Sequence, residues 1–367
     1  MNFTTFLLFM GWSMASLSLA FPKPLPSLRR PRTLHSRSSL PFTNSTISPS
    51  VVTQFPNNTW LENLAIRPNG QIIISLITTP ALYLVDPLDP SEHVLLGDFP
   101  QFKALLGITS FVPDEYYFVA GNFTSASSQD TVGVGSYAIM KLNMRPSTPV
   151  ITKVLDMPRA AFLNGLEVLS AEDGLLICAD STLGLVWWID VFKGTYEVLI
   201  DIPEMKYSDP NFLLGVNGIH LRDGYLYYTS MSQELFCRIP ITATPSNATS
   251  GAPFTIGSNE ILATGIFGDD FIFDRQGNAW IVQDPLDMLT LVITDGKAKG
   301  EVFTVAGMPG SDVVAGGTAC RFGKMETDED ILYVVTNGGL AAPPTTGIVG
   351  GKVLAFDTAG YVAKVLG

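Results

Sequence analysis

The sequence is poor in charged side chains and in histidine. Only 15% of its 367 residues are charged, and it has three histidines and three cysteines. Acidic residues number 34 against 22 basic ones, so the formal net charge is −12. An acidic surface repels phosphate backbones and anionic lipid, so we expect no nucleic-acid partner. With 46% hydrophobic residues, the chain still has ample material for a large core.

The scarcity of cysteine and histidine excludes some chemistry. Cys178, Cys237 and Cys320 are odd in number, so at least one has no partner within the chain. No C-x-x-C spacing occurs, which excludes a cysteine-based zinc site, and we expect buried, apolar cysteines. The G-x-S-x-G motif is absent, so no Ser-His-Asp triad is indicated. His220 lies inside a predicted strand and is either a packed histidine or a proton shuttle.

Residues 1–20 have the pattern of a signal peptide. An apolar run is followed by small residues, and Ser18 and Ala20 fit cleavage after Ala20. The run is too short and too interrupted to span a bilayer, which favours cleavage over a membrane anchor. No later stretch has about 18 uninterrupted apolar residues, so we expect no other membrane span. The chain is therefore predicted to enter the secretory pathway and to be extracellular.

Residues 21–50 are rich in Pro, Ser and Arg, which predicts a disordered leader. Within it, Arg29-Arg30 is either a dibasic processing site or part of a solvated tail. Acceptor triplets for N-linked glycans, which support a secreted protein, begin at Asn44, Asn57, Asn122 and Asn247.

One pattern recurs six times in residues 51–367. A short apolar strand leads into a turn, a second apolar strand ends in a small polar residue, and a third strand ends near Asp. Turns such as Asn69-Gly70 and Asp223-Gly224 are typical of hairpins. The copies begin at residues 64, 108, 166, 219, 271 and about 319, which matches the spacing of four-stranded propeller blades. We predict an all-β, six-bladed β-propeller. A β-sandwich is the second choice, but it would not require six similar units.

A propeller brings the starts of its innermost strands together at one mouth of a central channel. Side chains alternate along each strand, so polar residues at these starts share a pocket. The residues concerned are Trp60, Glu62, Asn164, Asn217, Phe267, Asp269, Asp270 and Arg321. Their carboxylate and amide oxygens are the ligands that Ca²⁺, Mg²⁺ or Mn²⁺ prefer. Trp60 and Phe267 suit an apolar ligand, and Arg321 is able to orient a carbonyl or anionic oxygen.

Two segments carry a resemblance to a known family. They are Asn217-Gly218-Ile219 before Tyr227-Tyr228-Thr229-Ser230, and Asp269-Asp270-Phe271-Ile272-Phe273-Asp274 with Gly277-Asn278-Ala279-Trp280. Across residues 55–367 the chain resembles the gluconolactonase and regucalcin superfamily of six-bladed propellers. The resemblance implies a divalent-ion site on Glu62, Asn217 and Asp269, with Asn164 as a further pocket residue.

The neighbours of this triad depart from the family pattern. The family's Glu is followed by Gly-Pro, whereas Asn63 follows Glu62, and the family's Pro-Asp-Gly is Gly268-Asp269-Asp270 in this chain. Retention of the metal is therefore left open. Asn also caps tight turns, so Asn164 and Asn217 have a structural alternative, and the two aspartates have the alternative of a solvated turn.

The altered triad and the predicted signal peptide resemble a particular subgroup. This subgroup is the fungal secreted propellers of secondary metabolism, which include hetero-Diels–Alderases of tropolone-sesquiterpenoid biosynthesis. The resemblance implies an enzyme that joins a small apolar terpene to a tropolone or polyketide quinone methide and requires no cofactor. The catalytic candidates are Asp269, Asn217 and Arg321, and the substrate-binding candidates are Trp60, Glu62, Asn164, Asp270 and Phe267.

Two alternatives stay open at this point. One is a lactonase or esterase that uses a divalent cation on Glu62, Asn217 and Asp269, because a bound ion polarises a carbonyl or activates water. The other is a propeller that binds a ligand without catalysis. The sequence predicts no oligomeric state.

Overall fold

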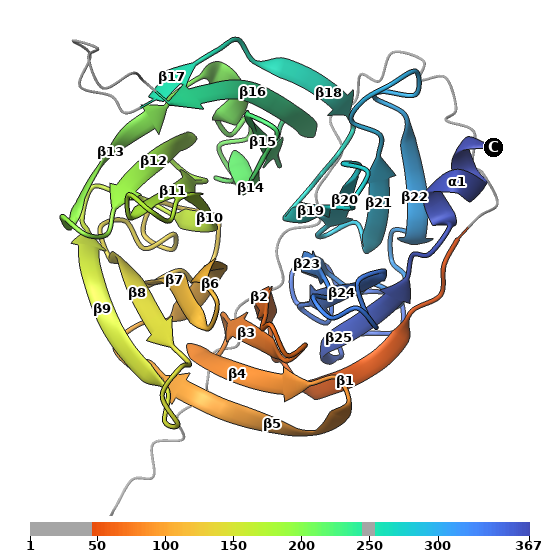
Figure 1. The fold of residues 1–367 in the computed structure, drawn as a ribbon, viewed down its shortest axis with the longest axis horizontal. Coiled ribbons are helices and arrows are strands. Elements are labelled where there is room, and N and C mark those ends of the chain that lie inside the picture. Colours follow the sequence, from red (N-terminus) through yellow and green to blue (C-terminus); the bar gives the residue numbers. More distant parts are fainter. Residues whose placement is uncertain (1–45, 244–253) are drawn as a thin grey trace, which may run out of the picture.

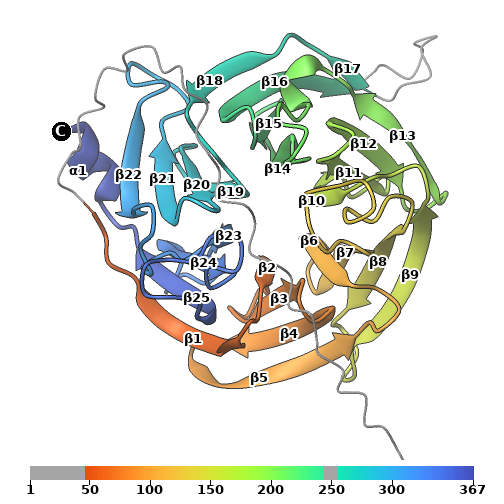
Figure 2. The same ribbon diagram turned by 180° about the vertical axis from the view of Figure 1, so that it is seen from behind.

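Six antiparallel sheets stand around a common axis, each with its strands in order from the centre outward (Figure 1). The computed structural model describes residues 46–243 and 254–367. The chain passes once around the ring, and the same arrangement is seen from behind (Figure 2). The predicted six-bladed β-propeller is confirmed, and the β-sandwich alternative is wrong.

The first three blades each consist of four strands in chain order. Blade 1 contains β2 (Leu61–Ile66), β3 (Ile72–Leu76), β4 (Ala81–Asp86) and β5 (Asp89–Asp98). Blade 2 contains β6 (Ala104–Val112), β7 (Glu115–Gly121), β8 (Tyr137–Asn143) and β9 (Val150–Met157). Blade 3 contains β10 (Leu163–Ser170), β11 (Leu175–Asp180), β12 (Leu185–Asp190) and β13 (Thr195–Ile200).

The last three blades carry the irregular features. Blade 4 contains β14 (Val216–Arg222), β15 (Tyr225–Ser230) and β16 (Leu235–Ala243), and β16 pairs with both β17 (Phe254–Ile256) and β18 (Glu260–Thr264). Blade 5 contains β19 (Phe271–Phe273), β20 (Ala279–Gln283), β21 (Met288–Val292) and β22 (Val302–Gly307). Blade 6 contains β23 (Gly317–Phe322), β24 (Ile331–Thr336), β25 (Gly350–Asp357) and β1 (Ser50–Asn57). A 3₁₀ turn, η1 (Pro203–Met205), precedes β14, and a short helix, α1 (Tyr361–Leu366), ends the chain.

The ring is closed by a strand from the other end of the chain. β1 forms the outer edge of blade 6, where it pairs with β25 in antiparallel register. Ile47 donates its backbone N–H to the Val305 carbonyl at 2.9 Å. Residues 46–50, at the carboxyl end of the predicted leader, lie against blades 5 and 6, because Ile47 bonds to blade 5 and Ser50 pairs with Ala355 of blade 6. Closure of this kind protects the edge strand that an open sheet would expose.

Burial falls from the centre of the ring outward. Every residue of β3, β11 and β20 is buried, whereas β5 and β9 are mostly exposed. The three cysteines are all buried and unpaired, as expected. The outer strands have no regular apolar pattern, because neither face is fully covered.

Glycines in three innermost strands allow neighbouring blades to crowd the axis. A Cβ on Gly107 would lie 2.2 Å from the Asn164 carbonyl oxygen, and one on Gly165 would lie 2.5 Å from the Asn217 carbonyl oxygen. A Cβ on Gly218 would likewise lie 2.8 Å from the Asp269 carbonyl oxygen. These glycines hold the starts of the innermost strands close together, and that closeness narrows the channel.

Several predictions concern residues that the structure does not describe. The signal peptide, most of the leader, and the glycan acceptors Asn44 and Asn247 lie outside the described residues. Asn57 is exposed on β1 and Asn122 is half-buried after β7. None of the helices in the described residues combines the length and apolar character needed to cross a membrane.

Candidate functional site

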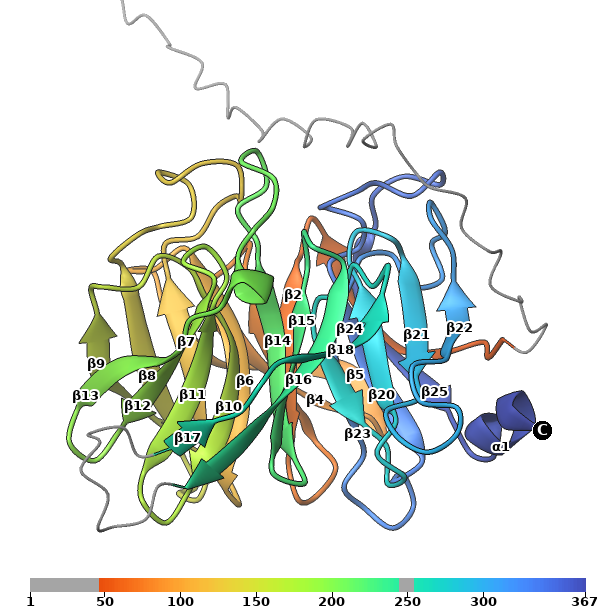
Figure 3. The same cartoon turned by 90° about the horizontal axis from the view of Figure 1, so that it is seen from above.

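The two ends of the channel are built differently. The longer connections, which are residues 122–136, 201–215, 308–316 and 338–349, rise on the face where the innermost strands begin (Figure 3). Short hairpins lie on the opposite face, where those strands end. We call the first end the loop mouth and the second end the hairpin mouth. A site at the loop mouth can be varied through its loops without changes to the sheets.

Three buried carboxyl groups gather at the loop mouth. Glu62 on β2, Asp269 before β19 and Asp284 after β20 are each no more than 6% exposed. The Trp60 indole N–H donates to Glu62 Oε2 at 2.7 Å, and the Asn337 amide donates to Asp284 Oδ2 at 2.9 Å. Asp284 Oδ1 has no hydrogen-bond partner among the described residues. No Lys, Arg or His from the described part of the chain is paired with any of the three carboxyls.

Burial raises the pKa values of all three carboxyl groups. Burial raises the pKa of Glu62 to about 8, with further increments from the charges of Asp284 and Asp270. Burial and the Glu62 charge raise the pKa of Asp269 well above its usual range, and a hydrogen bond from Asn217 offsets part of this. Burial also raises the pKa of Asp284 to about 7. Near pH 7 the cluster therefore offers carboxylic O–H groups that donate hydrogen bonds. A solvated carboxylate is ionised at this pH and can only accept them.

Aromatic and amide side chains complete the loop mouth. Trp60 and Phe267 are half-buried, and Phe267 packs against Phe212 with ring centroids 5.7 Å apart. Asn164 and Asn217 are 4% and 2% exposed on β10 and β14. The Asn217 amide lies 3.9 Å from the Met231 sulfur. The loop mouth thus joins an apolar, polarisable rim to buried hydrogen-bonding groups.

A second polar network crosses the channel below the loop mouth. It joins Asn63, Glu167, His220, Asp270 and Arg321, which come from five different blades, and we call it the cross-brace. Arg321 Nη1 donates to Asp270 Oδ2 at 3.0 Å, and Asn63 Nδ2 donates to the same oxygen at 3.1 Å. His220 lies between Asp270 Oδ1 at 3.0 Å and Glu167 Oε2 at 2.6 Å. Each of the five side chains is hydrogen-bonded to another member of the network, so the network holds the blades at a fixed spacing.

We call the three carboxyl groups of Glu62, Asp269 and Asp284 the acid cluster. The pKa shift of Asp270 in the cross-brace is opposite in direction to the shifts in the acid cluster. Burial alone would raise the pKa of Asp270, but the Arg321 and His220 charges outweigh it and hold that pKa well below its usual range. Burial alone would lower the pKa of His220, but the Asp270 charge and the hydrogen bonds to Asp270 and Glu167 raise it. Asp269 and Asp270 are neighbours in sequence, yet the pKa of Asp269 is raised and that of Asp270 is lowered. The reason is that, of the two, only Asp270 has cationic partners among the described residues.

The predicted residues separate into these two groups. Trp60, Glu62, Asn164, Asn217 and Asp269 lie at the loop mouth, and Phe267 packs at its rim. Asp270 and Arg321 lie in the cross-brace, where Arg321 pairs with Asp270 and not with Asp269. His220 is a packed residue of this brace rather than a free side chain.

The donor set at the loop mouth fits a hard divalent cation by its chemistry. Glu62 and Asp269 supply carboxylate oxygens and Asn217 supplies an amide oxygen, and such a cation would supply Lewis-acid polarisation of a bound carbonyl. In the described part of the chain, no three His, Cys, Asp or Glu side chains are grouped as a ready-made metal site. Any such ion would therefore depend on the Asn217 amide or on the substrate for further ligands.

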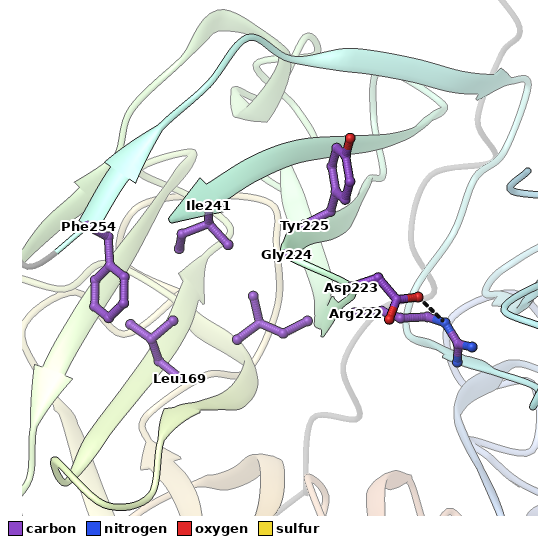
Figure 4. A pocket seen from close by; sticks show the side chains of 8 residues that line it. Leu169, Arg222, Asp223, Gly224, Tyr225, Ile241 and Phe254 are labelled. Atoms are coloured by element: carbon purple, nitrogen blue, oxygen red, sulfur yellow. Dashed lines mark hydrogen bonds and ion pairs between the residues drawn. The ribbon is translucent and has the colours of Figure 1, made fainter. Parts of the chain in front are cut away.

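A separate hollow lies between blades 3 and 4, away from the channel. It has a volume of about 260 Å³, and Leu169, Ile241 and Phe254 form its apolar side while the Arg222–Asp223 ion pair borders it (Figure 4). The Arg222 Nε and Asp223 Oδ2 atoms are 3.1 Å apart. None of the predicted site residues lines this hollow.

Comparisons with known proteins identify relatives of this chain by sequence and by fold. No protein-family model matches the chain. A candidate hetero-Diels–Alderase of Sarocladium schorii is 28% identical over 346 residues, which cover 85% of this chain and 84% of that protein. A candidate hetero-Diels–Alderase of a Phoma species is 25% identical over 311 residues, which cover 77% of this chain and 85% of that protein. Both of these relatives are named as candidate hetero-Diels–Alderases. The resemblance predicted from the sequence is confirmed.

Solved structures support the same fold at lower identity. Regucalcin from Agrobacterium tumefaciens superposes with a TM-score of 0.54 at 17% identity, covering 86% of this chain and 95% of that one. A luciferin-regenerating enzyme superposes with a TM-score of 0.57 at 12% identity, covering 85% and 96%. At this identity the likeness shows the six-bladed fold alone.

Proposed function

We propose that this chain is a pericyclase of the hetero-Diels–Alder type, with its active site at the loop mouth. One observation carries the proposal: a chain related over most of its length to candidate hetero-Diels–Alderases gathers buried hydrogen-bonding groups beside an aromatic rim. Reactions of this type need no leaving group and no co-reactant, so binding and orientation are the enzyme's main tasks.

The substrates we propose are a tropolone or polyketide quinone methide and an apolar terpene alkene. The oxygen, carbonyl carbon and two further carbons of the quinone methide add across the alkene. One C–C and one C–O σ bond form while three π bonds, two of the heterodiene and one of the alkene, become one, and no atom is lost. A hydrogen bond to the quinone-methide oxygen withdraws electron density and lowers the barrier. The Asn217 amide and the protonated carboxyl groups of Glu62 and Asp269 are the donors that the loop mouth offers.

The rim residues have a complementary role in this proposal. Trp60 and Phe267 present apolar faces that hold the terpene against the quinone methide and exclude water, which would otherwise add to the reactive carbon. Arg321 is paired with Asp270 in the cross-brace, so in this proposal it positions the inner strands rather than the substrate. The secretory route remains a proposal based on the predicted signal peptide.

The direct test is turnover with purified protein. A tropolone quinone-methide precursor and a humulene-type terpene are incubated with and without the protein, and the rate, product ratio and stereochemistry are measured. Product ratios and stereochemistry that match the buffer control would eliminate the proposal. Asn217→Leu is expected to lower the rate about fivefold, since a lost hydrogen bond contributes about 1 kcal/mol. Asp223→Asn, on an exposed hairpin, is the matched control and should leave the rate unchanged.

A metal-dependent lactonase is the second candidate. The observation in its favour is the hard oxygen donor set of Glu62, Asn217 and Asp269, none of which has a cationic partner among the described residues. This function predicts that EDTA abolishes hydrolysis of sugar or aryl lactones and that Asp269→Ala does the same. Full hydrolysis in excess EDTA rejects the metal-dependent function, and no turnover of either substrate class leaves a binding propeller.

A further inference from the structure

The hairpin mouth contains a cavity of its own. Its volume is about 290 Å³, close to the lower end of the range, about 300 Å³ upward, that small-molecule sites occupy. Arg321, His220 and Glu167 form its inner end, so the cross-brace is the floor of the cavity. The acid cluster of the loop mouth lies on the other side of that floor.

The walls of this cavity are largely apolar. Ile66 on β2, Ile108 on β6, Ile272 on β19 and Phe322 on β23 contribute them. Because these side chains come from four different blades, they surround the cavity on several sides. Ile66 and Ile108 are already buried between blades, so a ligand with an apolar body would bury surface mainly against the half-buried Ile272 and Phe322.

Among the described residues, the charged groups of the cavity include one cation, Lys324, that forms no ion pair. Arg321 is paired with Asp270. Glu167 uses both oxygens, accepting from the Val168 N–H at 2.7 Å and contacting His220 at 2.6 Å. Lys324 also lines the cavity, and its ammonium group has no hydrogen bond or ion pair to any other described residue.

Lys324 as a whole is exposed, but protein atoms around its ammonium group shield that group from water. Burial lowers the pKa of Lys324, and repulsion from Arg321 lowers it further. The nearby carboxylate of Asp114 is occupied by Arg67, whose Nε lies 2.9 Å from Asp114 Oδ1. A bound anion would relieve the repulsion between the two cations.

Two hydroxyl groups lie at the same cavity. Thr109 and Ser110 on β6 are half-buried, and neither side chain donates or accepts a hydrogen bond within the described part of the chain. Hydroxyl donors beside a lysine ammonium are the groups that bind a carboxylate.

We propose that the hairpin mouth is a second ligand site, which binds a small amphipathic monocarboxylate with its carboxylate on Lys324 and its apolar body against Ile272 and Phe322. The site is separate from the loop mouth, because the cross-brace lies between them. It does not depend on the pericyclase proposal, since none of its predicted contacts is a loop-mouth residue.

The test measures binding of three eight-carbon probes to the full protein by isothermal titration calorimetry. Octanoate carries the carboxylate, octanol has the same chain without charge, and octylamine has the opposite charge. We expect octanoate to bind at least tenfold more tightly than octanol and octylamine, because a charge-assisted hydrogen bond contributes about a tenfold gain. Equal affinity for octanoate and octanol would overturn the proposal, as would no octanoate binding up to about 1 mM.

Variants locate the site. Lys324→Gln should weaken octanoate binding about tenfold and leave octanol binding unchanged. Lys297→Gln removes an exposed lysine from another hairpin on the same face and should have no effect. Ser110→Phe should fill the cavity and abolish binding of octanoate. If Ser110→Phe leaves the affinity intact while Trp60→Ala weakens it, octanoate binds at the loop mouth and the proposal is wrong.

Discussion

The free energy of unfolding depends on single ion pairs in this channel, and the pair of Asp270 with Arg321 is the clearest case. Asp270→Asn leaves the half-buried Arg321 without its anion, and breaking an ion pair whose carboxylate is buried costs about 3 kcal/mol of unfolding free energy. Urea or guanidinium unfolding measures the loss.

Two comparisons separate this effect from a general loss of packing. Asp223→Asn removes the partner of Arg222 on an exposed hairpin, and we expect a change within about 0.5 kcal/mol. The double variant Asp270→Asn/Arg321→Met should recover part of the stability, because no unpaired charge remains. A double variant no more stable than Asp270→Asn would contradict the ion-pair explanation.

The raised pKa values at the loop mouth give the stability a definite pH dependence. Glu62 has a pKa of about 8 in the folded protein against an ordinary value of 4.5. Between these values the folded protein holds a proton that the unfolded chain has released, so the contribution of Glu62 to stability is fully present below about pH 4.5 and is lost as pH rises toward 8. Glu62→Gln should reduce this slope by up to about 1.4 kcal/mol per pH unit.

Unfolding free energies at pH 5, 6, 7 and 8 check the sign. The exposed Glu92→Gln is the control and should reproduce the wild-type slope. A Glu62→Gln variant with the wild-type slope would show that Glu62 does not carry the raised pKa. Asp284, with a pKa of about 7, contributes a weaker fall over a narrower range.

The sequence predicted the loop-mouth residues that start innermost strands, but it missed Asp284 and Asn337. Asp284 directly follows β20, the second strand of blade 5, and Asn337 directly follows β24, the second strand of blade 6. Antiparallel pairing places the end of each of these strands beside the start of the innermost strand of the same blade. The second strands end in small polar residues in the repeat, so a signal was present. Asn63 and Glu167 carried no such signal, because their partners come from other blades.

At the scale of an element, the glycines of the innermost strands determine how closely the blades approach. Gly107→Ala would place a methyl group 2.2 Å from the Asn164 carbonyl oxygen, which is backbone and cannot rotate away. We expect a loss of about 1–3 kcal/mol in unfolding free energy, the usual cost of overpacking. Ser110→Ala on the same strand is the control and should change stability little. Equal stability of the two variants would mean that the strands can separate without cost.

The buried inner strands could be predicted from the sequence, whereas the exposed outer strands could not. The first three strands of each blade have apolar runs and turn residues at their ends, and the predicted copies coincide with the observed elements. The outer strands β5, β9 and β13 alternate irregularly between exposed and half-buried residues, so no periodicity marks them. Their positions follow only from pairing with the third strand, which is a tertiary effect.

At the scale of the whole molecule, the repeat predicts the number of blades but not how the ring closes. β1 has mainly exposed residues and lies next to the predicted leader, so nothing in its pattern assigns it to blade 6. Its pairing with β25 joins residues about 300 apart in the chain, and contacts of that kind cannot be inferred from a local pattern. The closed ring in turn holds both mouths in shape, because the cross-brace and the acid cluster each need several blades in place.

Phe55 carries most of the packing of this closing strand. Its side chain is 5% exposed and packs between blades 1 and 6, stacked on His93 at 3.9 Å and edge-on to Tyr83 at 5.5 Å between centroids. Phe55→Ala should cost about 3–5 kcal/mol, as for other buried phenylalanines, and should weaken both ligand sites by opening the ring. Phe192→Ala, whose side chain is 65% exposed, is the matched control with a change within about 0.5 kcal/mol. Thermal unfolding combined with hydrogen exchange on β1 and β25 distinguishes local opening from global loss. Protection lost only on these two strands would show a seam that opens independently, whereas uniform loss across all blades is expected if closure supports the entire ring.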